Sequence, residues 1–263
     1  MADLAALLDD FAAECAELEN LVAPLTPEQW QTPTPAPGWD ITTQIAHLTW
    51  TDEVSVVAAT DTEAFTALVT EAAPKMFTFV DEAAAAVAQT PPAELLTRWR
   101  TGREQLIAAL AAVPTGTKLP WFGPPMSAAS MISARIMETW AHGQDVADTL
   151  GVTRTPTARL RTVAHISVRT RNFAYAVHGE SGPSDEFRVE LTAPDGTLWT
   201  WGPEDAPQRV TGPASDFCLL TTQRRHRADT TLTTEGPDAD HWLEIAQAFA
   251  GPPGPGRKKG QFA

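Results

Sequence analysis

Cysteine is scarce in this 263-residue chain, because Cys15 and Cys218 are the only two and they lie far apart without CxxC spacing. A disulfide framework or a thiolate zinc site is therefore not expected, and a reducing cytoplasm is predicted. No stretch approaches the roughly 18–20 continuous apolar residues that a membrane span needs. The first residues, Met1 to Leu4, carry no basic region followed by an apolar core, so no secretory signal is predicted.

Positive charge is also scarce. The chain has 19 Lys and Arg against 33 Asp and Glu, which gives a formal net charge of −14. Residues 1–150 hold 6 of these basic and 20 of these acidic side chains, whereas residues 151–263 hold 13 of each. Because an acidic protein repels phosphate backbones, nucleic acid is not expected as a partner. The 43% of hydrophobic residues is ordinary for a globular protein and argues against disorder of the whole chain.

The first half of the chain has the periodicity of amphipathic helices, with apolar residues at three- and four-residue steps. Asp40 and Ser127 are helix-capping residues at the expected starts, and Gly151 is a helix-stop signal. Four long helices joined by loops favour a four-helix bundle. Helices are predicted at 3–22, 41–59, 61–89 with a break near Pro74, 92–112 and 128–150.

The second half changes character after a boundary at residues 151–156. Alternating residues on either side of the turn Pro194-Asp195-Gly196 predict a β-hairpin. The predicted elements are a helix at 157–178, strands at 187–192 and 197–201, a helix from Pro213 to about Arg227, a β-rich stretch at 230–234 and a helix at 238–250. We therefore predict a two-domain α+β protein, with the bundle over 1–152, a small α+β domain over 153–252 and a disordered Pro/Gly-rich tail over 253–263.

The most specific chemical feature is the pair Glu138 and His142. Spacing of i, i+4 puts both side chains on one helical face, where a carboxylate and an imidazole can ligate one divalent metal. Asp145 is three residues further on the same face and is placed to orient the His142 ring as a partner outside the ligand set. The alternative interpretation is a surface Glu–His pair that adds a few tenths of a kcal/mol to the helix.

His47 lies in an apolar part of a second long helix. Taken alone, it fits a half-buried structural histidine, but a bundle brings inward-facing residues of two helices to one point, which is how bundles build metal centres. His47, Glu138 and His142 would form a set of two imidazoles and one carboxylate that leaves a coordination position open, as catalytic sites do. Asp52 and Glu53 follow on the same helix and are candidate partners of these ligands, although such pairs usually form a solvated face.

Two stretches carry a family resemblance: residues 39–48, WDITTQIAHL, and residues 138–145, ETWAHGQD. The chain resembles the mycothiol-dependent maleylpyruvate isomerase family over about residues 5–250. Residues 121–130, WFGPPMSAAS, and 191–196, LTAPDG, look typical of an actinobacterial subgroup described only as metal-binding. The resemblance implies a DinB-like N-terminal bundle, a small α+β C-terminal domain, and His47, Glu138 and His142 as ligands of a divalent metal. It does not imply the substrate of the subgroup.

The resemblance also implies a mechanism that uses mycothiol as a co-substrate. Coordination to a dication deprotonates a thiol, and the thiolate is then a nucleophile for an electrophilic small molecule. Addition followed by elimination gives isomerisation, and addition alone gives S-transfer. Two alternatives stay open: a thiol-independent metal-dependent hydrolase or tailoring enzyme of secondary metabolism, and a non-catalytic, metal-stabilised binding module. The donor set suits Zn²⁺ best and also accepts Fe²⁺, Ni²⁺, Co²⁺ or Mn²⁺.

Other residues receive weaker interpretations. Arg224 and Arg225, in a basic cluster predicted to end a helix, could clamp a carboxylate of the cofactor or substrate, or could compensate the helix C-terminus. Both cysteines lie in apolar helical patterns and are predicted to be core residues, so an external thiol is favoured as the nucleophile. Three loop aromatics at the ends of the predicted bundle are candidate pocket residues, namely Trp39, Trp121 and Phe122.

Overall fold

The computed structural model describes residues 3–75 and 78–262. The chain divides into two units, Met1–Val152 and Thr153–Ala263. The first unit is helical and the second combines helices with a four-stranded sheet, which confirms the predicted two-domain α+β class. Residues 1–2, 76–77 and 263, which belong to the predicted bundle, Ala-rich helix and tail, lie outside the described residues.

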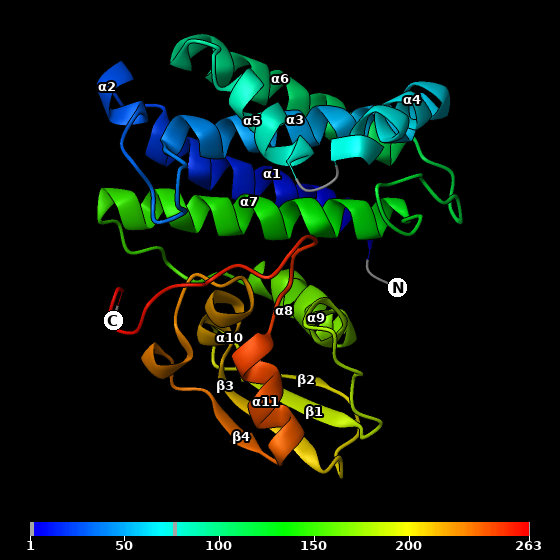
Figure 1. The fold of residues 1–263 in the computed structure, drawn as a ribbon, viewed down its shortest axis with the longest axis vertical. Helices are drawn as coiled ribbons and strands as arrows, with labels where there is room; N and C mark the ends of the chain where they lie inside the picture. Colours follow the sequence, from blue (N-terminus) through cyan, green and yellow to red (C-terminus); the bar gives the residue numbers. More distant parts are fainter. Residues whose placement is uncertain (1–2, 76–77, 263) are drawn as a thin grey trace. The chain divides into compact units, whose positions relative to one another are not determined.

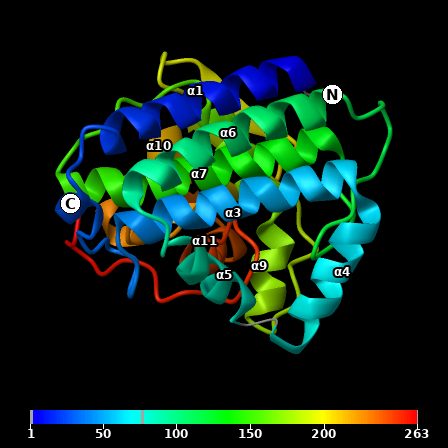
Figure 2. The same cartoon turned by 90° about the horizontal axis from the view of Figure 1, so that it is seen from above.

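Four long helices of the first unit run side by side as a bundle (Figures 1 and 2). Each agrees with its predicted range to within one residue at either end, because periodicity and capping signals coincide there. Their buried faces share one core, in which Phe11, Leu48 and Trp99 are fully buried. The four helices are α1 (Leu4–Val22), α3 (Ile41–Thr60), α6 (Pro92–Ala111) and α7 (Ala128–Leu150).

The two bundle helices that carry the candidate ligands are fixed by their own caps. At the start of α3, the Asp40 carboxylate accepts a hydrogen bond from the Thr43 N–H at 2.7 Å. At the start of α7, the Ser127 hydroxyl accepts one from the Ser130 N–H at 3.1 Å. Gly151 ends α7 with a φ of 66°, a left-handed conformation that glycine adopts without strain. The caps set where each helix begins, and so which residues face its neighbours.

Shorter elements connect the bundle helices. A capping box between Thr26 and Gln29 starts α2 (Pro27–Trp30). The Ala-rich segment after α3 forms two helices, α4 (Thr62–Ala72) and α5 (Phe79–Val87). A 3-10 turn, Ala73–Lys75, ends α4 at the predicted break. Within the described residues, no helix combines the length and the apolar character needed to cross a membrane.

The second unit is built around a mixed sheet in the order β2-β1-β3-β4. The predicted hairpin is confirmed, because β1 and β2 are antiparallel with Leu191 opposite Trp199. The strand β3 lies parallel to β1, and β4 is antiparallel to β3. The strands are β1 (Phe187–Thr192), β2 (Leu198–Trp201), β3 (Gln208–Pro213) and β4 (Thr233–Glu235). The helices are α8 (Leu160–Arg169), α9 (Arg171–Val177), α10 (Ala214–Thr221) and α11 (Pro237–Ile245), with a 3-10 turn at Arg227–Asp229.

Several predictions for the second unit are wrong in detail. The sequence analysis missed β3, and the predicted helix 157–178 is interrupted at Thr170 between α8 and α9. The helix predicted from Pro213 to Arg227 ends at Thr221, because Gln223 has a φ of 62° and the Arg224 N–H turns back to the Leu219 carbonyl at 2.7 Å. The last helix also ends early, at Ile245, where Ala246 takes an extended conformation.

The tail, predicted to be disordered from its Pro and Gly content, has irregular structure over its described residues. The Gly260 N–H donates a hydrogen bond to the Asp229 carboxylate at 2.7 Å. The Arg225 guanidinium lies 4.9 Å from the centre of the Phe262 ring. These contacts join the tail to residues elsewhere in the chain, so the composition of the tail does not predict them.

Candidate metal centre

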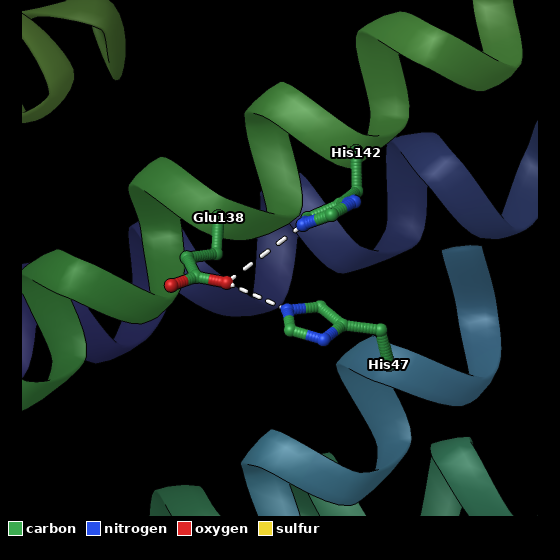
Figure 3. Close-up of side chains that lie close together, drawn as sticks. All are labelled: His47, Glu138 and His142. Carbon is green, nitrogen blue, oxygen red and sulfur yellow. Dashed lines mark hydrogen bonds and ion pairs between the residues drawn. The ribbon is translucent and has the colours of Figure 1, made fainter. Parts of the chain in front are cut away.

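Three potential metal ligands converge inside the first unit. His47 comes from α3, whereas Glu138 and His142 lie one turn apart on α7 (Figure 3). One ligand atom of each residue lies within 4.8 Å of those of the other two. Glu138 Oε2 is 2.9 Å from His47 Nε2 and 3.8 Å from His142 Nε2. Residues that are 91 positions apart in the chain therefore meet at one carboxylate oxygen.

The surroundings of Glu138 keep its carboxylate charged. Burial raises the pKa of this group, but the positive charge of Arg135, the hydrogen bond with His47 and the charges of both imidazoles outweigh that effect. The pKa of Glu138 is therefore well below its ordinary value. A carboxylate that stays ionised at neutral pH is a ready ligand for a cation.

The donor set fits a divalent cation. Two imidazole nitrogens and one carboxylate oxygen suit Zn²⁺ and related transition metals. The site is also accessible from one side, because the side chains of Glu138 and His142 are 24% and 14% exposed, whereas that of His47 is 8% exposed. Three protein donors would leave a coordination position open on a cation, as in catalytic metal sites.

A buried ion pair between Arg135 and Asp52 lies next to Glu138. The Arg135 side chain is 2% exposed, and its Nε lies 3.1 Å from Asp52 Oδ1. Its Nη2 donates to the Thr51 hydroxyl at 2.6 Å, and its Nη1 is 3.7 Å from Glu138 Oε2. Burial raises the pKa of Asp52 to about 6, against the opposing charge and hydrogen bond of Arg135. Asp52 thus lies near the ligand set as predicted, but it acts on Glu138 through Arg135.

The other predicted partners have different outcomes. Glu53 forms a two-bond ion pair with Arg98 of α6, at 2.6 and 2.8 Å, and so belongs to the solvated face. Asp145 is fully buried on α7, and its role in orienting His142 stays a prediction. The partner that the structure gives to His142 Nδ1 is Gln44 Oε1 on α3.

Sequence reasoning missed Gln44 and Arg135, although helical spacing offered a signal for both. Gln44 lies three residues before His47, and Arg135 lies three residues before Glu138. Side chains at i, i+3 share a helical face, so each missed residue lies on the face of a predicted ligand. Both are polar and almost fully buried.

Trp39 lies beside the ligands, as expected of a candidate pocket aromatic. Its ring stacks on that of His142, with centroids 5.8 Å apart and an interplanar angle of 17°. It is tilted toward His47 at 5.3 Å. The other two loop aromatics, Trp121 and Phe122, instead join a cluster with Phe65 of α4, at 5.9 and 5.2 Å.

The remaining predicted residues lie elsewhere. Cys15 and Cys218 are both free and fully buried, and burial is the main cause of the raised pKa of each thiol. Arg224 and Arg225 belong to the second unit, where their guanidinium groups donate to the carbonyls of Thr222 and Arg224, at 2.6 and 2.7 Å. Their part in binding a cofactor stays a prediction.

Fold and site together define a class: a two-unit α+β protein whose N-terminal bundle holds a candidate divalent-metal centre. The family model of the mycothiol maleylpyruvate isomerase N-terminal domain matches residues 11–147. The chain therefore belongs to the mycothiol maleylpyruvate isomerase family, as the sequence motifs indicated. A second model, described as wyosine base formation, matches residues 183–234.

Two relatives and two solved structures are also similar to this chain. Two proteins of Mycobacterium tuberculosis, from strains CDC 1551 / Oshkosh and ATCC 25618 / H37Rv, are described as uncharacterized; each is 56% identical over 98% of this chain and 100% of its own length. Crystal structures of the mycothiol-dependent maleylpyruvate isomerase and of a histidine-to-alanine mutant match with TM-scores of 0.60 and 0.61. Each covers 90% of this chain and 95% of the other, at 16% and 17% identity, so the likeness shows a shared fold.

Proposed function

We propose that this protein is a divalent-metal-dependent enzyme that activates a small thiol, of the mycothiol type, for transfer to an electrophilic small molecule or for its isomerisation. The observation that carries the proposal is the convergence of His47, Glu138 and His142 in a chain of the mycothiol maleylpyruvate isomerase family. Neither the fold nor the family alone would assign the chemistry.

The roles of the three ligands follow from their placement. His47 and His142 would each offer an Nε2 atom, and Glu138 would offer Oε2, to one cation, with Zn²⁺ preferred by the donor set. A divalent ion held there supplies the positive charge that lowers the pKa of an incoming thiol. Arg135 and Asp52 hold the Glu138 carboxylate in place. The Trp39 ring lies against both imidazoles, with centroids 5.3 Å from His47 and 5.8 Å from His142.

The nucleophile must come from outside the protein. Cys15 and Cys218 are 0% exposed, and the pKa of each is raised by burial, so neither thiol is available as a thiolate at neutral pH. A small thiol that enters from the exposed side of Glu138 and His142 is not buried in the core, so its pKa is not raised by burial. The burial of both cysteines therefore favours a thiol co-substrate over a protein nucleophile.

Within the second unit, taken by itself, we propose that Arg224 and Arg225 bind the carboxylate of a cofactor or substrate. Arg225 lines a cavity of about 170 Å³ together with Arg227 and Arg257. Guanidinium groups bind carboxylates through paired hydrogen bonds, which suits an organic acid better than a neutral ligand. Arg224 is adjacent in sequence and is assigned the same role.

Calorimetric titration with mycothiol tests the proposal. The zinc-loaded protein is expected to bind one mycothiol per chain and to release protons on binding, because the thiol loses its proton. His142→Ala, reconstituted in the same way, should lose this binding, whereas Arg98→Met, which alters a surface pair 45 residues apart in sequence, should keep it. Metal binding without thiol binding would contradict the proposal and favour the thiol-independent hydrolase. A cation whose coordination is closed by a fourth protein group would favour the binding module.

A further inference from the structure

We infer that Gln44 is a positioning residue that fixes which nitrogen of His142 carries the proton. The inference deepens the proposed function, since it concerns the same centre, and it rests on a chain of hydrogen bonds that begins at a backbone carbonyl. The chain runs from Trp39 O through Thr34 and Gln44 to His142 Nδ1. In each hydrogen bond, the donor and acceptor roles are fixed by the roles in the hydrogen bond before it.

The first link commits the proton of the Thr34 hydroxyl. Trp39 O accepts a hydrogen bond from the Thr34 N–H at 2.8 Å and a second one from Thr34 Oγ1 at 2.8 Å. A carbonyl oxygen can only accept, so the hydroxyl must be the donor in this contact. Thr34 Oγ1 is then left with its lone pairs, and the Ala36 N–H donates to one of them at 3.3 Å.

The second link sets the orientation of the Gln44 amide. Gln44 is fully buried, and its Nε2 lies 2.9 Å from Thr34 Oγ1. Because that oxygen has no proton left to donate toward Gln44, the amide must present its NH₂ group there. The carbonyl end, Oε1, is thereby turned toward His142. A flipped amide would place a carbonyl against an oxygen that can only accept in that position.

The third link determines the tautomer of His142. Gln44 Oε1 can only accept, so His142 Nδ1 must carry a hydrogen. In the neutral ring, Nε2 is then the unprotonated nitrogen, and this is the atom 3.8 Å from Glu138 Oε2. His47 differs, since its Nδ1 is buried and has no hydrogen-bond partner among the described residues. The structure therefore presets one of the two imidazoles as a ligand.

The loop that begins the chain of hydrogen bonds also covers the centre. Pro33 and Asp40 form a β-bridge, and Gly38 makes the turn between them with a φ of 80°. Trp39 contributes its carbonyl to Thr34 and its ring to His142. The same loop thus contacts the His142 ring by stacking and, through Gln44, fixes which of its nitrogens is protonated. Changes of residues that orient metal-binding histidines typically lower metal affinity 10–100-fold.

Nitrogen-15 NMR of the metal-free protein tests the inference directly, because the shifts of the two imidazole nitrogens identify the protonated one. At a pH where the ring is neutral, His142 of the wild type is expected to be protonated at Nδ1. Gln44→Met, which removes the acceptor at similar size, should abolish this preference. Gln44→Glu keeps an acceptor oxygen and should restore it. Gln144→Met is the matched control, since Gln144 is also buried on the bundle but donates to Asp148.

A second variant keeps the test independent of changes next to the ring. Thr34→Val removes the hydroxyl that orients the amide, and it should weaken the Nδ1 preference of His142 while leaving the His47 signal unchanged. Zinc affinity, measured by chelator competition, should fall about 10–100-fold in Gln44→Met and less than about 2-fold in the control. A wild-type His142 protonated at Nε2, or a preference unaltered in both Gln44→Met and Thr34→Val, would overturn the inference. Because the NMR measurement uses metal-free protein, a failure of this inference can be distinguished from a failure of the proposed thiol chemistry.

Discussion

Replacing Arg135 by Met is predicted to cause a large loss of stability. The guanidinium is 2% exposed and its nearest acidic partner, Asp52, is 0% exposed. Removing the cation leaves a buried carboxylate without compensation, and it also removes the hydrogen bond at 2.6 Å to the Thr51 hydroxyl. Breaking a buried ion pair by removing one partner costs about 3–5 kcal/mol. We expect a loss of that size in the free energy of unfolding of Arg135→Met.

Urea denaturation of the metal-free protein, followed by circular dichroism, measures this loss. The matched control is Arg98→Met, because Arg98 makes a two-bond pair with Glu53 but is 41% exposed. Exposed ion pairs contribute about 0–1 kcal/mol, so the control should change little. In the double variant Arg135→Met with Asp52→Leu, a coupling of more than about 1 kcal/mol is expected, because both members of the pair are gone.

The opposite outcome would be that Arg135→Met and Arg98→Met lower the free energy of unfolding by the same small amount. That result would mean that Arg135 is not a buried charge held by Asp52. A large loss without coupling to Asp52 would place the contribution of Arg135 in its packing instead. The two results therefore distinguish the ion pair from the aliphatic part of the side chain.

Three further predictions concern an ion-paired glutamate of α1, the two cysteines and the cap of α3. Burial raises the pKa of Glu19, but hydrogen bonds from two arginines outweigh burial, so the pKa is lowered. Because the folded pKa lies below the unfolded value, the stabilisation is present above about pH 4.5 and is lost as the pH falls. Glu19→Gln should therefore flatten acid unfolding curves. Cys15 and Cys218 should resist alkylation by iodoacetamide in native protein and react in urea, as mass spectrometry would show; rapid native labelling contradicts their burial. Asp40→Ala removes the cap of α3 and should cost about 1 kcal/mol in urea unfolding, whereas an unchanged midpoint argues against the cap.

The bundle was predictable because its signals are local. The long helices combine an apolar helical pattern with a start or stop signal, as in α7, which begins after Ser127 and ends at Gly151. The sheet was harder to predict. The strand β3, with the sequence QRVTGP, contains both Gly and Pro, and it is defined by parallel pairing with β1, a contact between segments distant in sequence.

The candidate metal centre was predictable in part for the same reason. Glu138 and His142 are one turn apart, so the sequence shows them as a pair, and the family motif adds His47. The contact between Gln44 and His142 joins positions 98 apart, and no local pattern reports it. The orientation of a side chain depends on which helices become neighbours, and that is a property of the packed bundle.

The most direct measurement of the central claim is the metal content of the purified protein after reconstitution with zinc and dialysis. We expect about one zinc ion per chain in the wild type, by mass spectrometry of the metal, and almost none in the variant that combines His47→Ala with His142→Ala. Arg98→Met, measured in parallel, should retain the wild-type value. A wild type without zinc, or a double variant with the same content as the wild type, would contradict the claim that His47, Glu138 and His142 form one metal centre.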